Sequence, residues 1–229
     1  MSIIAVVPAA GTGRRFGGDI PKQYLPLRGR TVMEHTLALL LSLPQIQRVV
    51  VVLHPDDTRW QTLPVFSDPC IERVLGGDER CHSVRNALLH IQARHPAAEW
   101  ALVHDVARPC CPRGDIEKLL RQLEHHPVGG LLAAPVSDTL KRVDAMQQIE
   151  ETVDRSSLWG ALTPQLFRAR LLADALEFCL SRDVLVTDEA QALEAIGMVP
   201  LVVEGSRRNL KITRPEDLAL AEYYLSLIA

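Results

Sequence analysis

The chain has 229 residues, of which 47% are hydrophobic and 23% are charged, and its formal net charge is −3. Such a composition is that of an ordinary globular protein, and its charge gives no basis for general affinity for nucleic acid or anionic membranes. No charged-then-apolar leader and no apolar run of about 18 residues is present, so neither a signal peptide nor a membrane span is predicted.

Short apolar runs alternate with helix-length amphipathic segments along the chain. Runs that are apolar at every position, such as Val49–Leu53, are typical of strands covered on both faces. The alternation predicts an α/β fold with a mostly parallel, Rossmann-like sheet and helices on both faces. The predicted strands are Ile3–Pro8, Arg48–Leu53, Ile71–Leu75, Trp100–His104, Gly130–Pro135 and Val199–Glu204. The predicted helices are Thr31–Leu43, Ser83–Arg94, Asp115–His125, Arg168–Leu180, Asp188–Ile196 and Pro215–Leu227.

The segment after the first strand is rich in glycine and small residues. Residues 8–17 are Pro-Ala-Ala-Gly-Thr-Gly-Arg-Arg-Phe-Gly, and Pro-Lys-Gln-Tyr-Leu follows at 21–25. Such a loop turns its N–H groups inward to hold an anion, at the strand end where open α/β sheets bind ligands. The Gly-Lys-Ser/Thr ending of a Walker A loop is absent, and Phe16 stands where the dinucleotide fingerprint needs a glycine. The pattern indicates the triphosphate loop of a nucleotidyltransferase; the alternative is a glycine turn with two solvated cations.

Arg15 and Lys22 fit the chemistry of such a loop. When a phosphate oxygen attacks the α-phosphorus of a nucleoside triphosphate, negative charge spreads over the non-bridging oxygens and the departing pyrophosphate. Fixed cations neutralise that charge. An attacking phosphate is already ionised, so the lack of a Ser-His-Asp pattern is compatible with this activity.

Residues 137–162 interrupt the alternation of strands and helices. Two short alternating runs flank a polar turn and predict a β-hairpin in place of a further βα unit. Because an isolated two-stranded ribbon is marginally stable in water, we expect a projecting dimerisation arm on a single domain of residues 1–229. A mobile surface loop is the alternative.

The spacing of the cysteines and histidines predicts neither disulfide bonds nor a metal site. Five cysteines without a disulfide spacing predict free thiols in a reducing cytoplasm. The eight histidines show no ligand spacing such as H-E-x-x-H, and no C-x-x-C pair is present, so no structural metal site is predicted.

Eight motifs in order carry a resemblance that spans nearly the whole chain. They are AAGTGRRF at 9–16, PKQYL at 21–25, GGDERCHSV at 76–84, HDVARP at 104–109, DTLKR at 138–142, LTPQ at 162–165, TDEA at 187–190 and NLKITRPED at 209–217. With these motifs the chain resembles the 2-C-methyl-D-erythritol 4-phosphate cytidylyltransferase family of the non-mevalonate isoprenoid pathway. One departure is Val106, where the family usually has alanine.

The resemblance implies a homodimer that transfers the cytidylyl group of CTP to 2-C-methyl-D-erythritol 4-phosphate, with Mg²⁺ and release of pyrophosphate; the cysteines, as above, predict a cytoplasmic location. It implies catalytic roles for Arg15, Lys22, Arg155 and Lys211, with Arg155 serving the neighbouring subunit's site. The nucleotide-binding residues that it implies are Ala9, Ala10, Gly11, Thr12, Gly13, Gly77, Asp78, Ser83 and Asp105. The implied substrate-binding residues are Arg108, Thr139, Arg155, Thr187 and Lys211. Asp105 is also the acidic residue expected beside the metal.

Several assignments have plainer alternatives. Ser83 could cap the helix that begins there, and Asp105 could cap the following turn. Arg155 and Lys211 could be solvated charges. For the whole chain, the alternatives are a ribitol 5-phosphate cytidylyltransferase of the same architecture or a non-catalytic nucleotide-binding module. The presence of Arg15, Lys22 and Lys211 argues against a mere binder, which needs no charge aimed at a transition state.

Overall fold

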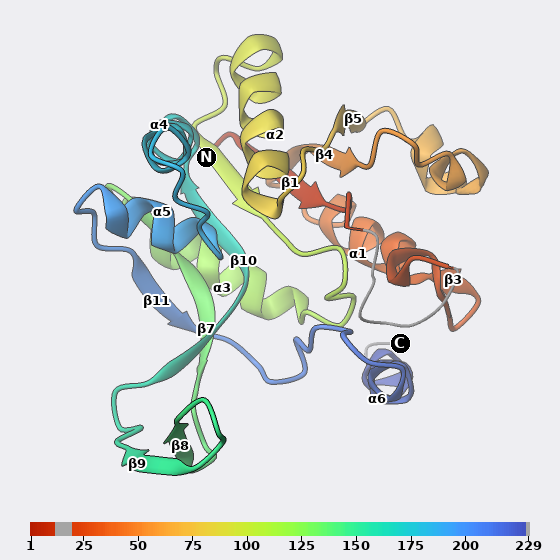
Figure 1. Cartoon of the computed structure of the whole chain (residues 1–229). Coiled ribbons are helices and arrows are strands. Elements are labelled where there is room, and N and C mark those ends of the chain that lie inside the picture. Colours follow the sequence, from red (N-terminus) through yellow and green to blue (C-terminus); the bar gives the residue numbers. More distant parts are fainter. Residues whose placement is uncertain (12–19, 228–229) are drawn as a thin grey trace.

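The computed structural model describes residues 1–11 and 20–227. Within these residues, seven strands form one sheet in the order β11-β7-β10-β6-β1-β4-β5 (Figure 1). The strands are β1 (Ile3–Pro8), β4 (Ile46–Leu53), β5 (Ile71–Leu75), β6 (Trp100–Val103), β7 (Gly129–Pro135), β10 (Trp159–Arg168) and β11 (Leu201–Glu204). Neighbouring strands are parallel except at β10, which runs antiparallel to β6 and β7. The predicted mostly parallel α/β sheet is confirmed.

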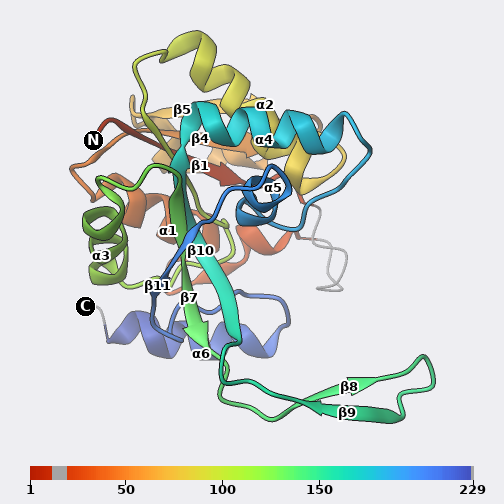
Figure 2. The ribbon, with the colours of Figure 1, turned by 90° about the vertical axis from the view of Figure 1, so that its left-hand side faces the viewer.

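Helices cover both faces of the sheet, as Figure 2 shows. Apolar side chains of α2, α4 and α5 pack on one face, and those of α1 and α3 pack on the other. A separate cluster joins α6 to Leu27, Val32 and Ile212. The helices are α1 (Val32–Leu41), α2 (Arg80–Arg94), α3 (Arg113–Leu123), α4 (Ala169–Leu180), α5 (Glu189–Ala195) and α6 (Glu216–Ser226). The shorter elements are η2 (Lys22–Tyr24), β2 (Pro26–Leu27), β3 (Arg30–Thr31), η3 (Arg59–Thr62) and η4 (Pro64–Ser67).

Strand β10 was not predicted from the sequence. It contains Pro164, and a proline within an apolar run argues against a central strand because it cannot donate to the ladder. The structure accommodates the proline where the pairing of β10 with β7 is irregular, between Ala161 and Gln165. Residues 159–162, predicted as the last part of the arm, therefore belong to the central sheet.

Helix ends follow local capping. Thr31 accepts from the backbone N–H of Glu34 and thereby caps α1, and Asp188 does the same for α5 through Gln191. Helix α2 begins at Arg80, earlier than the predicted start at Ser83. His82 accepts from the backbone N–H of Glu79 in this first turn, at 3.3 Å.

The predicted hairpin is present. Strands β8 (Leu140–Val143) and β9 (Ile149–Val153) pair as a separate two-stranded sheet that projects from the rest of the chain (Figure 2). We call residues 140–153 the hairpin.

All five cysteines are free, as predicted. Among the residues that the structure describes, no helix combines the length and apolar character needed to cross a bilayer.

Candidate active site

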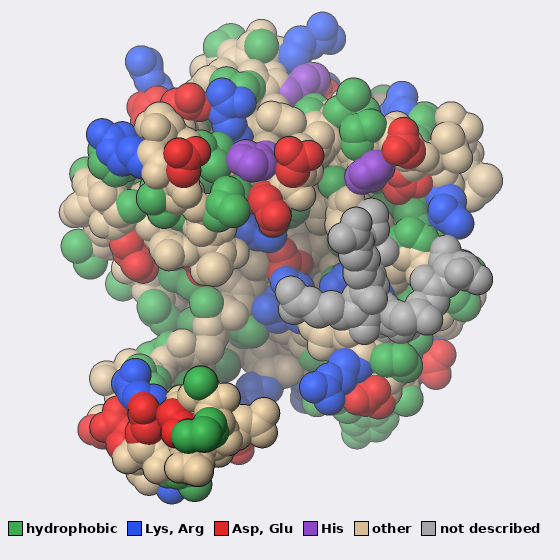
Figure 3. Space-filling view, viewed as in Figure 1, with side chains coloured by type: hydrophobic (Ala, Val, Ile, Leu, Met, Phe, Trp, Pro, Cys, Tyr) green, Lys and Arg blue, Asp and Glu red, His purple; other side chains and the backbone are tan. Residues whose placement is uncertain are grey.

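A cavity of about 250 Å³ lies where the carboxyl ends of β1 and β6 meet the loop between β5 and α2. This is the edge at which open α/β sheets bind ligands. In Figure 3, acidic and basic side chains lie together in a hollow near the centre of this face. The residues that line the cavity are 8–11, 22–23, 77–80, 83, 105–107 and 211.

The backbone of the cavity is held by close approach of two loops. A Cβ added at Gly76 would lie 2.5 Å from the Cβ of Ala10, so only glycine lets these loops come so near. Gln23 donates from Nε2 to the carbonyls of Ala9 (3.0 Å) and Gly11 (3.2 Å). Ser83 accepts from the N–H of Gly77 at 3.2 Å. These bonds shape a backbone surface next to charged side chains.

Asp105 is the centre of a buried charge cluster. Its Oδ1 lies 3.2 Å from Arg80 Nε, and its Oδ2 lies 2.8 Å from Lys211 Nζ and 3.6 Å from Arg108 Nε. Burial alone would raise the pKa of Asp105, but Arg80, Lys211 and Arg108 outweigh it and hold that pKa well below its usual range. A fixed negative charge therefore stands in the cavity wall.

Arg80 links this carboxylate to a second one. Its Nη1 and Nη2 donate to Glu189 at 2.6 and 3.1 Å, and the Glu189 side chain is 1% exposed. Burial favours the neutral guanidine, but the charges of Glu189 and Asp105 prevail and raise the pKa of Arg80. Burial also raises the pKa of Glu189, although Arg80 opposes the change. Neither Arg80 nor Glu189 was predicted as a site residue, although both lie inside motifs of the resemblance.

His104 and Thr163 position the backbone of Asp105. The Asp105 N–H donates to Thr163 Oγ1 at 3.0 Å, and Thr163 Oγ1 lies 2.9 Å from His104 Nδ1. His104 Nε2 lies 3.2 Å from the carbonyl of Arg108. Because a ring nitrogen can reach a carbonyl only as a donor, Nε2 carries the proton and Nδ1 accepts from Thr163. Burial lowers the pKa of His104 to about 4, so the ring is neutral at pH 7.

Two lysines distant in sequence come to the same cavity. Lys22 Nζ donates to the carbonyl of Ile212 at 3.1 Å, next to Lys211 in the chain. The segment that holds Lys211 is fixed by Arg108, whose Nη1 donates to the carbonyl of Asn209 at 2.6 Å. The N–H of Ile212 also donates to the carbonyl of Ala107 at 2.9 Å. Two ammonium groups thus face a glycine-containing backbone and one ionised carboxylate, an arrangement suited to binding a polyanion.

Known proteins of one family are similar to this chain over nearly its whole length. The family model described as 2-C-methyl-D-erythritol 4-phosphate cytidylyltransferase (IspD) matches residues 3–227. The chain belongs to this family. It is 51% identical over 225 residues to the family member of Vibrio vulnificus, with 98% of this chain and 95% of the relative covered. It is 53% identical over 225 residues to that of Yersinia pseudotuberculosis, with 98% and 92% covered.

Solved structures of 2-C-methyl-D-erythritol 4-phosphate cytidylyltransferases share the fold. The Francisella tularensis protein is 36% identical, has a TM-score of 0.84, and covers 98% of this chain and 100% of its own. The Thermus thermophilus protein is 31% identical, has a TM-score of 0.79, and covers 97% of this chain and 98% of its own. Membership of the family and the whole-chain fold are therefore established together.

Most residues predicted from the resemblance to this family lie together at the cavity. Those that line it are Ala9, Ala10, Gly11, Lys22, Gly77, Asp78, Ser83, Asp105 and Lys211. Thr12, Gly13 and Arg15 lie outside the described residues. Ser83 is not the cap of α2, because the helix already begins at Arg80. Asp105 is not merely a cap of the following turn, and Lys211 is not merely solvated, because the two form an ion pair.

Four predicted contacts do not line the cavity of this chain. Arg108 lies behind Asp105, with 9% of the residue exposed. The exposed Thr187 hydroxyl donates to Gln191 Oε1 at 3.1 Å. Thr139 is exposed before the hairpin, and Arg155, just after it, donates to the carbonyl of Ser137. The roles given to these four residues stay predictions.

Proposed function

We propose that this chain transfers the cytidylyl group of CTP to 2-C-methyl-D-erythritol 4-phosphate and releases pyrophosphate. Membership of the family supports the reaction. The observation that carries it in this chain is the convergence of Lys22 and Lys211 on one cavity beside the ionised Asp105. These two lysines are far apart in sequence, and a polyanion such as a nucleoside triphosphate in this cavity would lie close to both.

In the reaction, a phosphate oxygen of the acceptor attacks the α-phosphorus of CTP. A new phosphorus–oxygen bond forms as the bond from the α-phosphorus to the oxygen bridging it to the β-phosphate breaks, and that electron pair leaves with pyrophosphate. Lys22 and Arg15 neutralise the charge at the α-phosphate, and Lys211 and Arg155 position the acceptor. The ionised acceptor needs no base, so positioning and charge stabilisation supply the catalysis.

Mg²⁺ fits the donor set of the cavity. Asp105 presents an ionised carboxylate at the wall, and Mg²⁺ prefers one or two carboxylates together with phosphate oxygens and water. Asp105 would hold the ion, which would neutralise triphosphate charge when bound. Lys211 shares this carboxylate, so it would have to give up part of that contact when a metal–nucleotide complex arrives.

The hairpin completes the proposal as the contact between two copies of one domain. Apolar side chains on it are exposed, among them Val143 (48%), Met146 (74%) and Ile149 (65%). A second subunit would cover such side chains, and Arg155 would then reach the neighbouring cavity, as it does not reach its own.

The free thiols of all five cysteines support a reducing compartment such as the cytoplasm.

Pyrophosphate release with CTP, measured acceptor by acceptor, tests the function. We expect turnover with 2-C-methyl-D-erythritol 4-phosphate and at least about tenfold lower kcat/KM with ribitol 5-phosphate, because the linear ribitol chain has one more hydroxyl and no methyl branch and so fits a site shaped for the branched acceptor less well. Preference for ribitol 5-phosphate would overturn the acceptor. CTP binding without pyrophosphate release from any acceptor would leave a non-catalytic module.

A further inference from the structure

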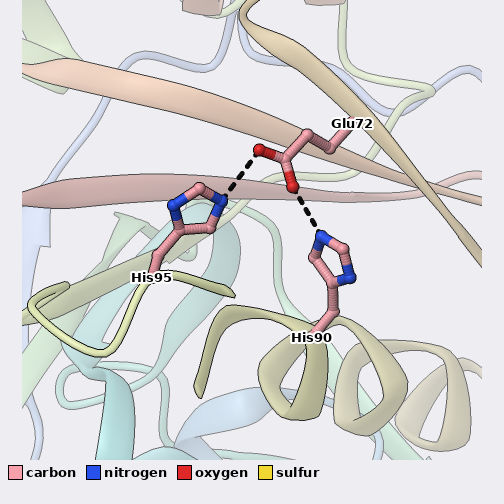
Figure 4. A group of neighbouring side chains, drawn as sticks. All are labelled: Glu72, His90 and His95. Carbon is pink, nitrogen blue, oxygen red and sulfur yellow. Dashed lines mark hydrogen bonds and ion pairs between the residues drawn. The ribbon is translucent and has the colours of Figure 1, made fainter. Parts of the chain in front are cut away.

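Glu72, His90 and His95 form a cluster of neighbouring side chains (Figure 4). Glu72 lies on β5, the edge strand, His90 lies near the end of α2, and His95 follows that helix. The rise of an α-helix is 1.5 Å per residue, so His90 lies about 15 Å along α2 from Arg80 in the cavity wall. The cluster is thus separate from the site described above.

The three side chains point at one another. His90 Nε2 lies 2.5 Å from Glu72 Oε2, and His95 Nε2 lies 2.8 Å from Glu72 Oε1. One ligand atom from each residue lies within 4.8 Å of the other two. Each side chain is about a quarter exposed: 24% for Glu72, 26% for His90 and 25% for His95. The group is accessible to an ion, yet it is held by a strand and a helix.

We propose that Glu72, His90 and His95 bind a divalent transition-metal ion of the zinc class. Two imidazoles and one carboxylate are a ligand set that Zn²⁺ uses, at about 2.0–2.2 Å, with water in the fourth position. Tetrahedral ligands at that length are about 3.3 Å apart, so small side-chain rotations suffice to bring these atoms around an ion. Two imidazoles favour zinc, copper or nickel over Mg²⁺, which takes oxygen ligands.

The surroundings are compatible with the ion. Burial alone would raise the pKa of Glu72, but hydrogen bonds from His90 and His95 outweigh it and hold that pKa below its ordinary value, so the carboxylate is ionised. Each ring would move its proton to Nδ1 and present the lone pair of Nε2. Arg48 Nε lies 3.8 Å from Glu72 Oε1, but its side chain is 42% exposed and can turn into solvent. A bound ion would tie the edge strand to the end of α2.

Calorimetric titration with ZnCl₂ and with MgCl₂ tests the site. We expect one zinc ion per chain and no comparable magnesium binding. In metal sites generally, replacing a residue that only contacts a ligand weakens metal binding about 10–100-fold. Replacing a ligand itself should do at least as much, so we expect His90→Gln, His95→Gln and Glu72→Gln each to weaken zinc binding at least about tenfold. His125→Gln, an exposed histidine elsewhere, is the matched control and should bind as the original chain does.

Cys70 is a thiol near the cluster that could bind zinc in place of the proposed ligands. Its Sγ lies 3.9 Å from Nη1 of Arg48, and Nε of Arg48 lies 3.8 Å from Oε1 of Glu72. A Cys70→Ser variant should keep the zinc ion. Zinc binding that survives all three ligand changes, or that is lost only with Cys70, would overturn the proposal. Should a ligand variant fail to fold, as judged by its metal-free unfolding transition, zinc-soaked crystals of the original chain decide: anomalous density is expected between the three side chains, and its absence there refutes the site.

Discussion

The cavity wall around Asp105 and the hairpin both carry opposite charges at contact distance, yet their surroundings differ. In the wall, Asp105 and Arg80 are 10% and 27% exposed, and Glu189 is 1% exposed. In the hairpin, Arg142 and Glu151 lie 2.6 Å apart with side chains 61% and 56% exposed. Water screens the hairpin pair, whereas the buried carboxylates of Asp105 and Glu189 depend mainly on their cationic partners in the wall. We therefore expect replacement of these residue types to cost much more stability in the wall than in the hairpin.

The largest effect is expected from breaking the wall. Arg80→Ala leaves Glu189 buried without its cation and should lower the free energy of unfolding by about 3–5 kcal/mol. Arg85→Ala on the same helix removes an exposed pair with Glu177 and should cost less than about 1 kcal/mol. Denaturant unfolding of both variants measures the difference. Equal losses would mean that burial of Glu189 does not set the cost.

Charge in the wall is also expected to act on catalysis. Lys22→Ala should lower kcat by about 10²–10³, the usual cost of losing one group that stabilises transition-state charge, and should weaken CTP binding much less. Lys118→Ala, which removes a lysine bonded to the carbonyl of Glu204 outside the cavity, should leave kcat unchanged. Steady-state kinetics with CTP in excess distinguish the two. A kcat for Lys22→Ala within a few-fold of the original would remove its proposed role.

Buried His104 should make stability depend on pH. Its folded pKa of about 4 lies below the ordinary 6.5, so between these values the unfolded chain binds the extra proton. The resulting stability is complete above pH 6.5 and is lost as pH falls to about 4, by about 3 kcal/mol. His104→Gln should flatten the dependence over this range, and exposed His125→Gln should not. If the free energy of unfolding depended on pH in the same way for His104→Gln and the original chain, His104 would not be the source of the pH dependence.

Arg155, which follows the hairpin, should give the smallest effect on stability and a distinctive effect on activity. Arg155→Ala is an exposed change and should alter the free energy of unfolding by no more than about 0.5 kcal/mol. If subunits share sites, mixing it with Lys22→Ala at equal amounts should restore about a quarter of full activity, because half of the symmetric dimers are mixed and each has one intact site. No rescue, with subunit exchange verified, would exclude the sharing of sites.

Local pattern was enough to predict most elements of the sheet. Short apolar runs of strand length predicted six of its seven strands. Thr31 and Asp188, which are residue types that favour N-caps, cap α1 and α5 in the structure. Strand β10 was not predicted, because a proline within an apolar run disfavours a strand. The structure accommodates Pro164 where the pairing of β10 with β7 is irregular. Serine is a preferred N-cap residue, so the sequence favours a helix start at Ser83, whereas in the structure Glu79 is the N-cap and α2 begins at Arg80.

For the site, the sequence alone determined the glycine-rich loop, the cations near it and, through ordered motifs, the family. Those features are local, so composition and order suffice to show them. Only the tertiary structure placed Lys211 beside Lys22, gave Arg80 and Glu189 to Asp105, and gathered Glu72, His90 and His95 at one edge. Such contacts depend on how strands are ordered in the sheet, and spacing along a chain carries no record of that order.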